Sequence, residues 1–184
     1  MTKFKPFTTT LIGSLPRTKE LLLLKESSNN SSKYEKAYKE KLLEETRRVV
    51  ELQKECGIDV IVSGELNRDN YMSYVAEVVD GIKLLNMEEV MSLTNNTDNF
   101  SKSLEEMDAA DDTMNSPICF SKLDTKKRLN DFEFGILKEL VDGDIKCTLP
   151  SPYLLTRSMW LKEVTGKVYD GRRELGEDVV ELLC

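Results

Sequence analysis

Residues 57–74 read GIDVIVSGELNRDNYMSY, and this stretch decides how the chain is expected to fold. Its first glycine ends a long helical pattern over residues 34–56, in which apolar side chains recur along one stripe. Residues 58–63 are almost continuously apolar, which is typical of a strand buried on both faces of a parallel sheet. Gly64 and Glu65 close that strand. The order predicts a helix followed by a buried strand whose carboxyl end carries an acidic side chain.

A second strand is predicted at the N-terminus, over residues 7–12. Its sequence FTTTLI is aromatic and β-branched, and Gly13 and Ser14 close it in front of a Leu-Pro pair. Strand, helix and strand joined by short connections form a βαβ unit. The right-handed crossover of such a unit makes its two strands parallel neighbours.

The alternation of strands and helices continues towards the C-terminus. Further strands are predicted over residues 117–120 and 145–149, and further helices over residues 67–81, 132–141 and 153–162. Such alternation is typical of an α/β protein. Four strand units make about half of a (β/α)8 TIM barrel, whose usual length is about 250 residues. We therefore predict an α/β fold, a partial (β/α)8 TIM barrel of about four βα units with parallel strands.

The length of the chain favours one domain. A chain of 184 residues with 40% hydrophobic composition can bury one sizeable core, so residues 1–184 are predicted to form a single partial-barrel domain. Residues 87–115 are acidic, rich in Asn, Met and Ser, and weakly periodic, which indicates an insertion or a mobile excursion. Residues 174–184 are amphipathic, and their apolar stripe requires a partner surface.

Charge and hydropathy exclude two classes of partner. The chain carries 26 Lys and Arg against 33 Asp and Glu, with a net charge of −7, and the basic residues are scattered. Nucleic acid is therefore not an expected partner. The longest apolar run, residues 21–24, is far shorter than the roughly 20 apolar residues that a bilayer span needs, so no membrane partner is expected. The N-terminus lacks the apolar segment of a secretory signal, and we predict a cytoplasmic protein.

Histidine is absent from the sequence. Catalysis by a Ser-His or Cys-His pair is therefore excluded within this chain, and acid–base chemistry falls to carboxylates, Lys, Tyr or Cys. The four cysteines lie far apart without a Cys-x-x-Cys pair, which fits neither a disulfide framework nor a zinc knuckle. These residues predict no metal site, and no catalytic residue is assigned.

The candidate site lies where three predicted strands end. In a parallel barrel the carboxyl ends of the strands share one face, and that face holds the substrate. Ile12, Gly13 and Ser14 end the first strand, where the glycine lets backbone amides approach a ligand and the serine supplies a hydroxyl. These groups suit the carboxylate or the amine of an amino acid. A plain strand-to-loop turn accounts for the same tripeptide.

Glu65 is the acidic residue of this face. An ionised carboxylate directly after a buried strand needs a partner, such as the ammonium group of a substrate. A salt bridge to Arg68 is the alternative interpretation. Four further residues are candidates for a secondary role in binding: Asn67, Arg68, Asp69 and Ser151. Arg68 and Asp69 equally fit a local ion pair or the charges of a helix start.

Three segments together resemble the catalytic barrel of cobalamin-independent methionine synthases. They are TTTLIGSLPRT at residues 8–18, GIDVIVSGELNRDNYMSY at residues 57–74 and KCTLPSP at residues 146–152. The resemblance spans nearly the whole chain except residues 87–115. It implies a barrel fold and the activity of a 5-methyltetrahydropteroyltriglutamate-homocysteine S-methyltransferase in methionine biosynthesis. Homocysteine or methionine is then the expected partner.

The resemblance also implies residue roles and a cofactor. It assigns the backbone and hydroxyl groups of Ile12 and Ser14, and the carboxylate of Glu65, to the amino-acid end of homocysteine or methionine. In the full-length family, zinc holds the homocysteine thiol as a reactive thiolate. Its ligands, a His, two Cys and a Glu, come from strands beyond the end of this chain, so no cofactor is expected here. The family's aromatic residue for the pterin falls on Ser158, with Trp160 two positions later, which argues against folate binding.

Three hypotheses are open at this point. The first is a truncated member of the methionine synthase family that lacks activity on its own. The second is a half-barrel module for binding or assembly, which pairs with itself as a homo-oligomer or with a separately encoded second half and so buries the open sheet edge. The third is a different barrel enzyme that uses Glu65 without a metal.

Overall fold

The computed structural model describes residues 4–94 and 115–184, which form two compact units. The first unit comprises residues 4–67 and 130–148, and the second comprises the described residues of 68–129 together with 149–184. Each unit has its own sheet and its own buried core. Whether the two act as the single predicted domain stays a prediction.

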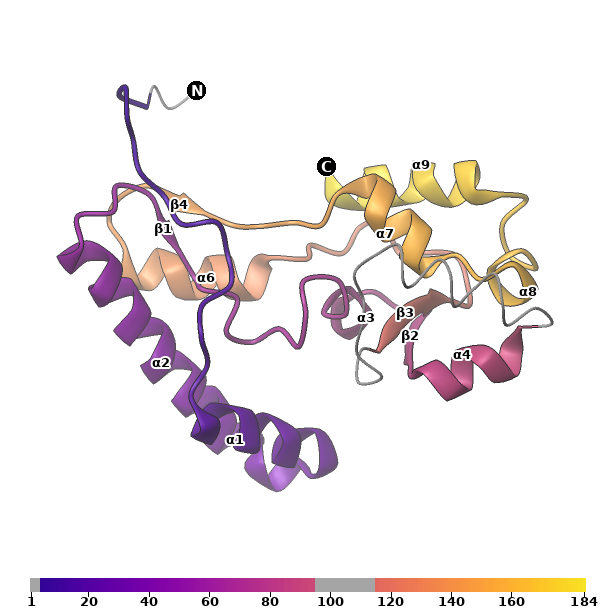
Figure 1. The fold of residues 1–184 in the computed structure, drawn as a ribbon, viewed down its shortest axis with the longest axis horizontal. Coiled ribbons are helices and arrows are strands. Elements are labelled where there is room, and N and C mark those ends of the chain that lie inside the picture. The colour runs from indigo at the N-terminus through magenta and orange to yellow at the C-terminus, as the bar shows by residue number, and fades with distance from the viewer. Residues whose placement is uncertain (1–3, 95–114) are drawn as a thin grey trace. The chain divides into compact units, whose positions relative to one another are not determined.

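The first unit contains the parallel sheet. Strand β1 (Ile61–Val62) pairs in parallel with β4 (Ile145–Lys146), with Ile61 opposite Ile145. Next to β1, Val60 forms a parallel bridge with Thr10. The segment that contains β1 is therefore the central one of three parallel segments, and Figure 1 shows it beside β4. A mixed α/β fold with parallel strands in one sheet is confirmed, although the regular pairing is shorter than predicted.

Helix α2 (Glu35–Glu55) is the helix predicted in front of β1. It ends at the glycine that the sequence indicated, because Gly57 has a φ of 70° and continues the chain in the left-handed region. Near its end, the buried side-chain amide of Gln53 donates to the carbonyl of Val62 at 2.9 Å and accepts the N–H of Val62 at 3.0 Å. The side-chain amide of Gln53 thus bonds both backbone groups of Val62, as a neighbouring strand would, and connects α2 to β1.

Three further helices complete the first unit: α1 (Lys19–Asn30), the short 3-10 helix η1 (Ser32–Tyr34) and α6 (Asp131–Leu140). Helix α1 was not predicted. Its first turn is capped by Thr18, whose hydroxyl accepts the N–H of Leu21 at 3.3 Å. Leu21 packs with Leu42 and Val49 of α2 in one core cluster. A second cluster joins α2, β1 and α6 through three buried residues: Val50, Ile61 and Leu137.

The second unit contains an antiparallel pair instead of a further parallel strand. Strand β2 (Ile82–Leu85) pairs with β3 (Ser116–Cys119), with Ile82 opposite Cys119. The prediction that residues 117–120 add a parallel strand was therefore wrong. The reason is local. The helix predicted over residues 67–81 is only one turn long, α3 (Val75–Val78). Gly81, with a φ of 90°, then leads into strand β2, which was not predicted and which pairs with β3.

The described residues of the second unit also form α4 (Met87–Leu93), α7 (Pro152–Met159), α8 (Lys162–Thr165) and α9 (Arg172–Leu183). Helix α4 begins in a complete capping box of Asn86 and Glu89, so the start of the predicted excursion over residues 87–115 is helical. The rest of that excursion, residues 95–114, lies outside the described residues.

Helix α9 covers the amphipathic stretch at the C-terminus. It packs against α7, and both Val179 and Leu182 are buried in the core of the second unit. The apolar stripe that was predicted to need a partner surface is therefore covered mainly by this chain, while Val180 is 47% exposed.

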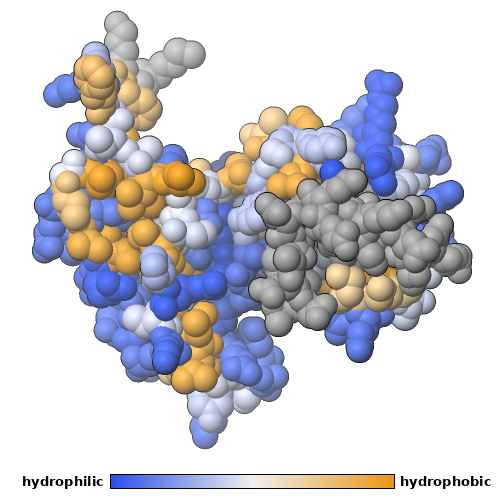
Figure 2. Space-filling model, viewed as in Figure 1, coloured by the Kyte–Doolittle hydropathy of each residue, from blue (hydrophilic) through white to orange (hydrophobic). Residues whose placement is uncertain are grey.

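The described ranges hold no helix with the length and apolarity needed to cross a bilayer. Exposed apolar side chains do occur, and in the first unit the most exposed ones are Phe7 at 98% and Ile12 at 94%. Figure 2 shows hydrophobic surface on the visible face of this unit.

Candidate functional site

The candidate site begins where β1 ends. Gly64 and Glu65 both adopt left-handed backbone conformations, with φ values of 77° and 54°. The glycine adopts this conformation at little cost, whereas a residue with a Cβ pays roughly 1–2 kcal/mol. The turn is fixed from outside by Leu15, whose N–H donates to the carbonyl of Gly64 at 2.9 Å. It leaves the Glu65 residue only 8% exposed.

Two hydroxyl groups donate to the Glu65 carboxylate. The hydroxyl of Ser14 donates to Oε2 at 2.5 Å, and that of Thr148 donates to Oε1. Ser14 follows the first predicted strand, and Thr148 follows β4. Three segments far apart in the sequence therefore meet at one carboxylate, at the carboxyl ends of three parallel segments.

Gly13 completes this arrangement because it lies close to the same carboxylate. A Cβ at this position would overlap Oε1 of Glu65 and lie 3.4 Å from the methyl group of Thr148. The need for glycine here comes from close approach, since its φ is not in the left-handed region. We call Gly13, Ser14, Glu65 and Thr148 the rim cluster.

The other predicted residues of the first unit lie around the rim cluster in different ways. The side chain of Ile12 is 94% exposed, so only its backbone fits the role that the resemblance implies. The carbonyl of the preceding residue, Leu11, accepts a hydrogen bond from the ammonium group of Lys146 in β4. Asn67 is partly buried, and its backbone carbonyl accepts a hydrogen bond from the ammonium group of Lys25.

Three secondary candidates belong to the second unit. Arg68 is 2% exposed, and its guanidinium lies 4.1 Å from the ring centre of Tyr74. Ser151 caps helix α7 by accepting the N–H of Leu154 at 3.2 Å. Asp69 is exposed. The contacts of Arg68 and Ser151 within their own unit give each a structural role.

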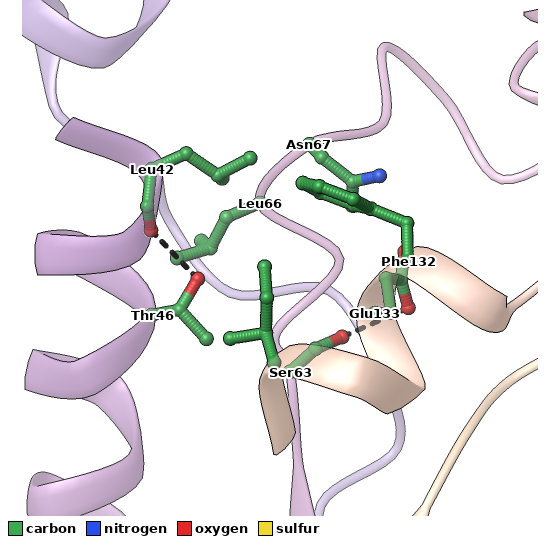
Figure 3. A pocket seen from close by; sticks show the side chains of 8 residues that line it. Leu42, Thr46, Ser63, Leu66, Asn67, Phe132 and Glu133 are labelled. Carbon is green, nitrogen blue, oxygen red and sulfur yellow. Dashed lines mark hydrogen bonds between the residues drawn. The ribbon is translucent and has the colours of Figure 1, made fainter. Parts of the chain in front are cut away.

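A small cavity lies between α2, α6 and the residues that follow β1 (Figure 3). It holds about 210 Å³ of empty space, part of it open to solvent, and eight residues line it: Leu42, Thr46, Ser63, Leu66, Asn67, Phe132, Glu133 and Ile136. Figure 3 shows the side chains of Ser63 and Glu133 pointing towards each other, and the Ser63 hydroxyl donates to Oε2 of Glu133 at 3.0 Å. Both residues are buried.

Sequence reasoning missed three polar residues: Thr148, Ser63 and Glu133. Thr148 could have been found, because it stands at the end of a predicted strand like Ser14 and Glu65. Ser63 also stands at a strand end, but its hydroxyl serves the backbone, since it accepts the N–H of Glu65 at 3.2 Å. Glu133 gave no signal, because one acidic residue in the first turn of an amphipathic helix is ordinary.

A second carboxylate anchors the N-terminal segment of the sheet. Asp59 accepts both the N–H and the hydroxyl of Thr9, each at 2.8 Å. These hydrogen bonds favour the ionised form, and they lower the pKa of Asp59 below its usual value. The aspartate of the quoted stretch therefore joins two strands and lies at the opposite end of β1 from Glu65.

The described residues contain no group of three or more His, Cys, Asp or Glu side chains that could hold a metal ion. Cys56 and Cys184 are exposed, Cys147 is partly buried and Cys119 is buried. Desolvation raises the pKa of the Cys119 thiol to about 11, so this cysteine stays protonated at neutral pH. The residues present in the described ranges thus do not fit the zinc that the resemblance implies.

Comparison with known proteins finds one family and several relatives whose sequences are similar to this chain. The sequence model of a family described as "Cobalamin-independent synthase, Catalytic domain" matches residues 7–139. Proteins named 5-methyltetrahydropteroyltriglutamate--homocysteine methyltransferase are similar over shorter stretches. The one from Coxiella burnetii (strain RSA 331 / Henzerling II) is 36% identical over 78 residues, which are 42% of this chain and 10% of that protein.

Two further relatives carry the same name. The protein from Dictyostelium discoideum is 36% identical over 75 residues, which are 41% of this chain and 9% of the relative. The protein from Thermodesulfovibrio yellowstonii (strain ATCC 51303 / DSM 11347 / YP87) is 35% identical over 82 residues, which are 45% of this chain and 11% of the relative. The matched stretch is thus about a tenth of the length of these relatives.

Proposed function

The chain belongs to the cobalamin-independent synthase catalytic-domain family, and we propose that its rim cluster binds the amino-acid end of homocysteine or methionine. The observation that carries the proposal is the convergence of Ser14 and Thr148 on the Glu65 carboxylate. A buried carboxylate is stabilised by hydrogen bonds and by a cation, and the ammonium group of an amino acid supplies both.

The hydrogen-bonding capacity of the cluster suits such a ligand. An ionised carboxylate offers about four acceptor sites, and the two hydroxyls take one on each oxygen. An ammonium group needs acceptors, and carboxylate oxygens are acceptors that it prefers. Ile12, a residue that is 94% exposed, precedes Gly13, and its backbone would offer polar groups to the carboxylate of the same ligand.

The proposed role within the reaction is binding and orientation. In the family reaction a methyl group passes to the thiol of homocysteine, and the rim cluster would hold the other end of that molecule. Because the described residues supply no fitting zinc site, we propose no chemical step for the side chains of this chain. We propose further that the three parallel segments and helices α2 and α6 are part of a (β/α)8 barrel, as the family match and the parallel pairing support.

Pairing of this chain with a second copy or with a second half of the barrel stays a prediction, as does its cytoplasmic location. The burial of α9 within the second unit removes one of the surfaces on which pairing was expected to rest. The solution mass of the purified chain tests self-pairing, because a monomer at micromolar concentration would contradict it.

The binding proposal is tested by isothermal titration of the purified chain with L-methionine. A matched ligand, 4-(methylthio)butanoate, keeps the thioether and the carboxylate but lacks the amine. We expect saturable binding of L-methionine and at least about tenfold weaker binding of the analogue, because a charged hydrogen bond to Glu65 is lost. Glu65→Gln should weaken the binding of L-methionine by a similar factor and leave the affinity for the analogue unchanged. Equal affinity for both ligands, or no binding of L-methionine, would refute the proposal.

A further inference from the structure

Glu65 combines two features that rarely occur together. It is buried, and it holds a left-handed backbone conformation, with a φ of 54°, although it is not a glycine. Such a conformation persists only where the surroundings enforce it, and it concentrates at functional sites. The side chain is held by Ser14 and Thr148, and the carbonyl of Gly64 by Leu15, so the remaining question is what holds the N–H of Glu65.

A chain of two hydrogen bonds leads from the backbone of Glu65 to helix α6. The N–H of Glu65 donates to the hydroxyl oxygen of Ser63 at 3.2 Å, and that hydroxyl donates to Oε2 of Glu133 at 3.0 Å. Ser63 is 8% exposed and Glu133 is 5% exposed, so water competes little for these bonds. Figure 3 shows the second bond at the wall of the cavity.

We propose that Glu133, acting through Ser63, is a positioning residue that holds Glu65 in its left-handed conformation and thereby fixes the place of the Glu65 carboxylate. Insofar as it concerns the ligand, this inference rests on the proposed function. The backbone part stands on the geometry alone.

The direction of the hydrogen bonds explains why an acidic residue serves here. A serine hydroxyl has one proton, and an ionised carboxylate only accepts. Glu133 therefore draws the proton of Ser63 towards α6, which turns a lone pair of the hydroxyl towards the N–H of Glu65. Without an acceptor on α6 the hydroxyl can rotate, and the N–H of Glu65 loses its oriented partner.

The position of α6 does not depend on this contact alone. Leu137, one turn after Glu133, is fully buried and packs with Val50 and Ile61. Substitution of Glu133 should therefore leave the helix docked and change the hydroxyl that it orients. This separates a positioning role from a general role in folding.

The test uses four variants of the full chain. Glu133→Ala and Ser63→Ala break the hydrogen-bond chain, and Glu133→Gln keeps an acceptor oxygen without the charge. Thr46→Val is the matched control, because Thr46 lines the same cavity and is buried, but its hydroxyl donates to the carbonyl of Leu42 in its own helix.

The first readout needs no ligand. Backbone chemical shifts and the φ-dependent coupling of Glu65, measured by NMR, distinguish the left-handed conformation from an extended one. We expect Glu133→Ala and Ser63→Ala to move Glu65 away from the values of the parent chain. Glu133→Gln and Thr46→Val should retain them. A folded Glu133→Ala chain with unchanged Glu65 signals would overturn the proposal, and Ser63→Ala decides by the same criterion if Glu133→Ala does not fold.

The second readout is the affinity for L-methionine. Loss of the backbone constraint should weaken binding by about tenfold in Glu133→Ala and Ser63→Ala, with partial or full rescue in Glu133→Gln. Unchanged affinity in both disrupting variants would overturn the link to binding. If the parent chain does not bind L-methionine, the proposed function fails, and the NMR readout still decides the positioning role.

Discussion

Hydroxyl groups have different partners in the core of the second unit and at the rim cluster of the first. In the second unit, Thr165 is fully buried, and its hydroxyl accepts the N–H of Leu161 at 3.1 Å and donates to the carbonyl of Cys119, 2.9 Å away. The hydroxyl of Tyr169 likewise accepts the N–H of Leu123 at 3.0 Å, and it donates to Oδ2 of Asp178 at 2.7 Å. These hydroxyls satisfy backbone groups that the fold leaves without a partner, which is what a buried hydroxyl in a stable core must do.

In the first unit, the hydroxyls of Ser14 and Thr148 both donate to the same carboxylate, that of Glu65. They bring negative charge and acceptor capacity to one point at the end of the parallel sheet. The difference teaches how to tell a site from a core in this molecule: the core hydroxyl of Thr165 bonds backbone groups, whereas the rim cluster gathers two hydroxyls from distant segments around one buried carboxylate. Substitutions should therefore affect stability in the second unit and binding in the first.

The largest effect is expected at Thr165. Thr165→Val keeps the shape but leaves the N–H of Leu161 and the carbonyl of Cys119 without this partner, which should lower the free energy of unfolding by about 1–3 kcal/mol. The measurement is urea unfolding followed by the fluorescence of Trp160, the single tryptophan, which lies in the second unit. Affinity for L-methionine should not change.

Thr156→Val in α7 is the control for this substitution. The hydroxyl of Thr156 donates to the carbonyl of Pro152 in its own helix, and the side chain is only partly buried. Its removal should alter stability by less than about 0.5 kcal/mol. Equal losses in the two variants would show that the hydroxyl of Thr165 has no special role in closing the core.

The next effect is expected from adding one methyl group to a glycine in each unit. Gly13→Ala places a Cβ on Oε1 of Glu65 and should displace the carboxylate, so that L-methionine binds about tenfold more weakly. In the second unit, the Cβ of Gly176→Ala lies 3.6 Å from Thr156, which is ordinary contact. Because Gly176 is inside α9, this variant should be more stable by about 0.5–1 kcal/mol.

Titration and urea unfolding of both glycine variants check this pair of expectations. The comparison is contradicted if Gly13→Ala binds L-methionine like the parent chain, since the carboxylate would then tolerate the added methyl group. It is also contradicted if Gly176→Ala loses affinity, since the site would then extend into α9.

Sequence alone predicted the parts of the fold that depend on local signals. The helix that ends before Gly57 and the buried strand after it were predicted because an amphipathic period, a left-handed glycine and an apolar run each act over a few residues. The convergence of Ser14 and Glu65 was also predicted, because parallel strands place their carboxyl ends on one face.

The errors came from segments whose structure depends on distant partners. Residues 116–119 form a strand as expected, but their direction is set by Ile82–Leu85, which gave only a weak strand signal. Helix α1 contains Ser27 and Asn30, which read as a polar loop, and its docking on α2 through Leu21 overrides that low propensity. Glu133 was missed because its partner Ser63 is 70 residues away in sequence.

The smallest effect is expected at Asp59, which joins Thr9 to the sheet at the end opposite the rim cluster. The N–H of Thr9, and then its hydroxyl, lower the pKa of Asp59 in the folded chain. A depressed folded pKa contributes stability above the unfolded value, about 3.9, and that contribution is lost as the pH falls through the folded pKa. The chemical shift of the Thr9 amide proton should therefore titrate below pH 4. The same proton should titrate identically in the Glu65→Gln chain, because Asp59 and Glu65 lie at opposite ends of β1. Asp59→Asn should abolish the titration. A Thr9 shift that titrates equally in Asp59→Asn would assign the effect to another group and remove Asp59 from the account of how the N-terminal segment is held.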